Sequence, residues 1–143
     1  MTLIKTKHGD YHEKINIPLY RYNVYVVFAE NATKAKTARF PELTQDVGDA
    51  YTLTVKDEAD TTLIFEYNAS PGIIAHEVWH AVRRLMSWIG ASDLENEVTA
   101  YHINYLVDEI WDIKKQVNKA RREEKIDGLS TVRIVGKESE RQD

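Results

Sequence analysis

Apolar and polar residues alternate along residues 19–30, and this period of two predicts a half-buried strand. Its apolar face consists of Tyr20, Tyr22, Val24, Val26 and Phe28. Two further strands are predicted over residues 50–56 and 61–68, because the short acidic connection between them suits a hairpin. Residues 1–17 are polar and mixed, and we predict no element there.

Capping residues predict two helices. Asn31 caps a short helix over residues 32–39, which a proline ends. Ser70 caps a second helix that has proline at its first position and Gly90 just past its end. Apolar residues four or three apart form the predicted buried stripe of this second helix, namely Val78, Val82, Leu85 and Ile89.

A third, long helix is predicted over residues 92–124, where the sequence Ser-Asp-Leu-Glu forms a capping box at the start. Its first half is apolar on nearly all sides and should be central. The charged segment 114–125 is expected to project from the body. Residues 126–143 hold one β-like run at residues 131–135, followed by a polar tail.

Length and composition are those of one α+β domain in a chain of 143 residues, with its core over about residues 19–113. The net charge of −4 argues against a general nucleic-acid binder. With no cysteine, a metal site must use histidine and carboxylate. No apolar run is long enough to span a membrane. We therefore expect a cytoplasmic protein or a component of a larger assembly.

His76-Glu77-Val78-Trp79-His80 is the motif that predicts chemistry. On a helix, His76 and His80 project from the same face, one turn apart, so their imidazoles can hold one Zn²⁺. Glu77 lies beside the pair, where its carboxylate can take a proton from water. Arg83 and Arg84 follow the motif and are either solvated or able to clamp a substrate carboxylate.

A catalytic zinc usually has a third protein ligand, for which Glu97 is the best candidate. It shares a polar wedge of the third helix with Tyr101, Asn104 and Asp108. Asp93 and Glu95 are rival ligands, and Glu97 could instead be a glutamate stabilised by the helix dipole. Tyr101 is either an oxyanion donor or a buried tyrosine bonded to backbone.

The segment Ala75-His-Glu-Val-Trp-His-Ala81, taken with Glu97-Val-Thr-Ala-Tyr101, resembles the gluzincin-type zinc metallopeptidases. The glutamate spacing is similar to that of the ImmA/IrrE-like peptidases, and the compact arrangement is more similar to small HExxH proteins of tailed bacteriophages. The resemblance implies a zincin-like fold with a small antiparallel or mixed sheet, a HExxH helix and a long glutamate helix. It also implies Zn²⁺ on His76, His80 and Glu97. Val-Trp inside the motif, and the lack of an obvious DNA-binding domain, depart from the ImmA/IrrE pattern.

Three hypotheses for the function follow from these residues. The leading hypothesis is hydrolysis of a peptide or protein substrate, with Glu77 as general base and Tyr101 as oxyanion donor. Strand 61–68 would form the cleft edge and bind an extended peptide. The alternative is a zinc-stabilised structural or assembly protein, as in a virion, that binds a protein partner through its long helix. A metal-free helical binding module is the third hypothesis.

Overall fold

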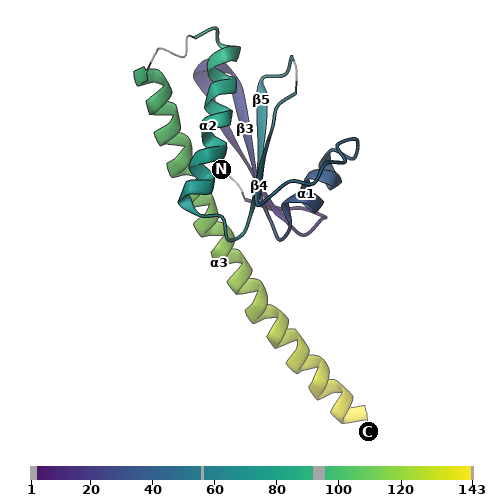
Figure 1. The fold of residues 1–143 in the computed structure, drawn as a ribbon. Helices are drawn as coiled ribbons and strands as arrows, with labels where there is room; N and C mark the ends of the chain where they lie inside the picture. Colours follow the sequence, from purple (N-terminus) through teal and green to yellow (C-terminus); the bar gives the residue numbers. More distant parts are fainter. Residues whose placement is uncertain (1–2, 56, 92–95, 143) are drawn as a thin grey trace.

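The computed structural model describes residues 3–55, 57–91 and 96–142. In these residues the fold is α+β: a five-stranded mixed sheet and three α-helices (Figure 1). The strands are β1 (Ile4–Lys5), β2 (Tyr11–Ile17), β3 (Tyr22–Ala29), β4 (Ala50–Leu53) and β5 (Asp60–Glu66). The helices are the 3₁₀ turn η1 (Pro18–Tyr20), then α1 (Ala32–Arg39), α2 (Pro71–Trp88) and α3 (Asn96–Gln142).

The sheet has the strand order β1-β2-β3-β5-β4. β3 and β5 are parallel, whereas the other neighbouring pairs are antiparallel. The predicted hairpin of β4 and β5 is therefore present, but β5 lies inside the sheet. The expectation that strand 61–68 forms the edge is wrong, since β4 occupies that position.

The alternation predicted along the first strand is confirmed in β3. Tyr22, Val24, Val26 and Phe28 are buried in the main core with the inner sides of α2 and α3. The other face of β3 contributes Val27 and Ala29 to a smaller cluster that includes residues of α1. The strand begins later than predicted because Pro18 starts the turn η1.

β2 contradicts the prediction that residues 1–17 hold no element. Its side chains alternate, with Tyr11, Glu13, Ile15 and Ile17 buried. Three of these four residues belong to the main core, which therefore begins before residue 19. The glutamate among them interrupts the apolar pattern that would otherwise signal a strand.

The N-caps predicted at Asn31 and Ser70 are confirmed, whereas the capping box predicted at residues 92–95 lies outside the described residues. The Asn31 side chain accepts a hydrogen bond from the backbone N–H of Lys34 at 2.9 Å. Ser70 Oγ accepts one from the N–H of Ile73 at 3.2 Å. At the other end of α2, Gly90 has a φ of 74°, a left-handed conformation that suits glycine.

α3 is longer than predicted and packs on the body further along its length. Its apolar stripe buries Leu106, Ile110, Ile113 and Val117, and Glu124 still bonds Lys5 Nζ at 2.8 Å. One side of the segment 114–125 therefore lies against the body while most of its residues are exposed, and the helix projects beyond it (Figure 1). The expected β-like run at 131–135 is wrong, since these residues continue α3. None of the described helices is both long and apolar enough to cross a membrane.

Glu13 is a carboxylate placed on the core side of β2 with 1% of its surface exposed. Neither carboxylate oxygen has a hydrogen-bond partner among the described residues. Burial, aided by the charge of Glu109, raises the pKa of Glu13 above its ordinary 4.5. As the pH rises through 4.5, the unfolded chain ionises before the folded one, so this residue lowers the free energy of unfolding until the folded carboxyl also ionises.

Glu13→Leu is therefore expected to raise the free energy of unfolding at neutral pH by about 1–3 kcal/mol. Urea unfolding between pH 4 and pH 8 measures it, and the gain over the parent should grow with pH. Glu13→Gln is the matched control, because it removes the titration but keeps an unpaired polar group. A Glu13→Leu variant less stable than the parent at neutral pH would contradict the prediction.

Candidate metal and hydrolase site

α2 presents His76 and His80 on one exposed face, one turn apart. Their Nε2 atoms lie 3.3 Å from each other, and the ring centroids are 5.0 Å apart. The two side chains therefore converge, as the spacing predicts. Buried Ile74, Val78 and Val82 hold the opposite face of the helix in the core, which fixes the direction of the histidine face.

The histidine pair has the spacing that a tetrahedral metal ion requires. Two nitrogens each about 2.0–2.1 Å from one Zn²⁺ stand roughly 3.3–3.4 Å apart at a tetrahedral angle. The observed 3.3 Å fits two of the ligand positions of such an ion. The same separation also fits a hydrogen bond between two neutral imidazoles, one donating and one accepting.

Glu77 lies between the histidine face and the sheet. Its residue surface is only 8% exposed, and the Thr52 hydroxyl donates to its Oε2. The same hydroxyl lies 3.4 Å from the Glu77 carbonyl oxygen. Thr52 thus fixes the carboxylate from β4. The sequence gives no sign of this contact, because no spacing rule links a strand residue to a helix 25 positions later.

Two shallow hollows flank Glu77, which lines both. One, of about 380 Å³, lies between β4 and the side chains of His80 and Arg84. The other, of about 450 Å³, contains His76 and the N-terminal turn of α2. Arg84 donates to the Val55 carbonyl at 3.2 Å, so it is bound to the protein rather than solvated.

Glu97 does not join the histidine pair. It is exposed and lines a different hollow, which shares no residue with those beside Glu77. Throughout residues 3–55, 57–91 and 96–142, no three histidine, cysteine, aspartate or glutamate residues form a group that could hold a metal ion. Asp93 and Glu95, the rival ligands, lie outside the described residues.

The path of α3 explains this separation. Figure 1 shows α3 on one side of α2 and β4 on the other. Residues of β4 line both hollows beside Glu77. Glu97 is the second residue of α3, whereas His80 precedes the end of α2 by eight residues, or roughly 12 Å of helix.

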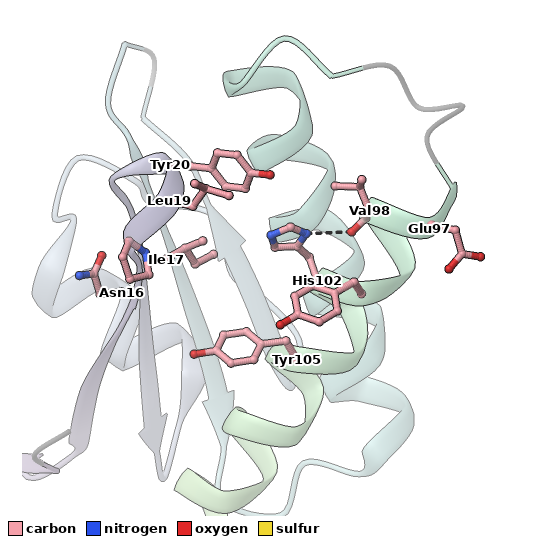
Figure 2. Close-up of a pocket in the computed structure, with 10 residues that line it drawn as sticks. Asn16, Ile17, Leu19, Tyr20, Glu97, Val98, His102 and Tyr105 are labelled. Carbon is pink, nitrogen blue, oxygen red and sulfur yellow. Dashed lines mark hydrogen bonds between the residues drawn. The ribbon is translucent and has the colours of Figure 1, made fainter.

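Tyr101 lies with Glu97, not with Glu77. It is 66% exposed, and its ring contacts the His102 ring at 5.6 Å. Asn104 and Asp108 are exposed as well, so the predicted polar wedge of α3 exists but faces solvent. Glu97 and Tyr101 line one hollow. Figure 2 shows the Glu97 carboxylate directed away from it.

Comparisons with protein-family models, with curated proteins and with solved structures gave no match.

Proposed function

We propose that this protein is a zinc-dependent, zincin-like hydrolase of peptide bonds, in which His76 and His80 hold the metal and Glu77 is the general base. The observation that carries the proposal is the convergence of the two Nε2 atoms to 3.3 Å on the helix that also positions Glu77. If the two histidines were only solvated surface residues, nothing would require a buried, hydrogen-bonded carboxylate between them and the sheet.

The roles of the protein groups follow from their positions. Zn²⁺, when bound, would supply a Lewis acid that polarises a carbonyl and lowers the pKa of water. Because the Thr52 hydroxyl donates to Oε2 of Glu77, Oε1 is left to accept a proton and return it to the leaving nitrogen. Thr52 is thus a positioning residue, and its hydroxyl limits rotation of the carboxylate.

The edge strand indicates the form of the substrate. β4 pairs with β5 on one side and is the last strand of the sheet, and its Thr52 contacts Glu77. An extended peptide added beside β4 would receive main-chain hydrogen bonds and pass the histidine face. We therefore propose an unfolded or extended segment as substrate, with β4 taking the role first assigned to strand 61–68.

A second candidate function, that of an assembly or structural protein, is supported by the length of α3. Two histidines are fewer protein ligands than either a catalytic or a structural zinc usually has, and no third ligand joins them within the described residues. α3 extends far past the body (Figure 1), which suits an assembly or structural protein that contacts a partner. In this role the metal would stabilise the fold without turnover.

Metal analysis of purified variants tests the proposal. We expect the parent, prepared without chelator and resupplied with Zn²⁺, to hold close to one equivalent by elemental analysis. His76→Ala and His80→Ala should each lower zinc affinity strongly, because each removes one of two convergent nitrogens. Glu97→Ala should bind zinc as the parent does, because Glu97 lies with a different hollow.

The matched controls are Asp93→Ala and Glu95→Ala, the other two carboxylates considered as ligands. Loss of zinc in one of them alone would identify a third ligand and leave the proposal standing. Failure of the parent to bind zinc would overturn both metal-dependent functions. The histidine pair would then be a hydrogen-bonded pair of imidazoles.

A further inference from the structure

A third hollow lies on the opposite side of the helical layer, away from the histidine pair. It has a volume of about 670 Å³ and is formed by η1, the residues before it and the first turns of α3. This volume lies within the usual range of small-molecule sites, about 300–1,000 Å³. It shares no residue with the hollows beside Glu77, so what binds here is independent of the proposed hydrolysis.

His102 supplies the polar group of this hollow. It is only 7% exposed, and its Nδ1 lies 2.8 Å from the Val98 carbonyl oxygen. A carbonyl can only accept, so Nδ1 carries the proton, and in the neutral ring Nε2 keeps its lone pair. Figure 2 shows Nδ1 facing Val98 and the opposite edge of the ring facing Ile17 and Tyr20. The hydrogen bond to Val98 uses Nδ1, which leaves Nε2 on the edge of the ring that faces Ile17 and Tyr20.

The walls around His102 are aromatic and apolar. The rings of Tyr20 and Tyr101 each lie 5.6 Å from the His102 ring, and Tyr105 also lines the hollow. Leu19, which is 81% exposed, stands at its margin on η1. Such walls favour a flat ring, which can stack on them or meet their edges. Among the described lining residues only Glu97 has a formal charge, and its carboxylate is directed away from the hollow (Figure 2), so the lining favours a neutral ligand.

We propose that this hollow binds a neutral, planar aromatic small molecule that carries an N–H or O–H donor, with His102 Nε2 accepting the hydrogen bond. Shape and stacking come from the tyrosines, and the single acceptor selects a donor on the ring. Glu97 and Tyr101, which the sequence assigned to the metal centre, lie at this second site instead.

Indole and benzofuran are matched probes, because they have the same shape and differ in one ring atom, a donor N–H against an oxygen. Isothermal titration of the full chain at pH 8 should show indole binding more tightly than benzofuran by on the order of tenfold. His102→Phe keeps a flat ring but removes the acceptor, so its two affinities should become nearly equal.

Leu19→Trp tests the place of binding without touching the core, because residue 19 is exposed. The larger side chain should fill the mouth and weaken indole binding by about tenfold or more. Val55→Trp adds the same side chain at another exposed residue, outside this hollow, and should bind indole as the parent does. Equal affinities of the parent for the two probes, no indole binding at millimolar concentration, or unchanged binding in Leu19→Trp would each overturn the proposal.

Discussion

Glu77→Gln is expected to lower the turnover of a zinc-loaded preparation by about 10²–10⁴-fold while zinc content stays that of the parent. The amide cannot accept the proton, yet it has the size of the carboxylate and can still accept the Thr52 hydrogen bond through its oxygen. The proposed metal ligands are untouched, because the imidazoles lie on the neighbouring, exposed face of α2. Release of fluorescence from a pool of quenched peptides, with elemental analysis of the same sample, measures both quantities.

Glu97→Gln is the control, since it makes the same chemical change on α3, away from the histidine pair, and should keep parental turnover. The turnover of Thr52→Val should lie between those of the two glutamine variants, about 10–100-fold below the parent, because this change removes the hydroxyl that orients Glu77. Turnover retained in Glu77→Gln would exclude this glutamate as the base. A zinc-loaded parent that cleaves none of the peptides would favour the structural function.

Local signals in the sequence were sufficient for α1 and α2. Each has a capping side chain followed by a helical pattern, and each begins at the predicted residue. A cap interacts only with the next few backbone N–H groups, so nothing distant has to be known. The alternation along β3 correctly predicted the face that joins the main core, but the strand is not half-buried, because Val27 and Ala29 on its other face are buried as well.

Elements that depend on tertiary context were not predictable in the same way. β2 has an inward glutamate at the centre of its alternating pattern, so Glu13 masked the strand. At the end of α3, β-branched residues favoured a strand by local propensity. The helix continues through them, since extending an existing helix costs far less than starting one.

In the candidate site, too, the local part was predictable from the sequence and the long-range part was not. The motif on α2 specified the convergence of His76 and His80, because four residues of helix determine it. The wheel of α3 correctly grouped Glu97 with Tyr101, but no periodicity states on which side of α2 the next helix packs. The strand order likewise placed β4, and with it Thr52, at the edge where β5 was expected. Long-range packing therefore decided the partners of the motif.

Asp10→Ala is expected to lower the free energy of unfolding at neutral pH by about 3–5 kcal/mol, since it leaves a largely buried guanidinium without its partner. Arg39, in the last turn of α1, donates from Nη1 to Oδ2 at 2.9 Å and from Nη2 to Oδ1 at 2.7 Å. The Thr6 hydroxyl also donates to Oδ1. These contacts join the turn between β1 and β2 to a helix 29 residues away. Urea unfolding of the parent and the variant measures the loss.

The free energy of unfolding at acid pH separates the contribution of the Asp10 charge from that of the shape of its side chain. Burial alone would raise the pKa of Asp10, but the hydrogen bonds and charge of Arg39, with the Thr6 hydroxyl, outweigh it and hold the pKa below 3.8. The contribution of this carboxylate is therefore full above the unfolded pKa and is lost as the pH falls through the folded one. Asp10→Asn should remove that part of the acid dependence while keeping the shape of the side chain.

The double variant Asp10→Ala with Arg39→Met completes the cycle, because it removes both charges and leaves neither buried alone. Its loss of stability should be smaller than the sum of the two single losses, by on the order of 1–3 kcal/mol. Strict additivity would mean that the two side chains stabilise the fold independently, against the paired geometry of their hydrogen bonds. Since Glu13 acts in the opposite direction as pH rises, the cycle is best measured at one neutral pH.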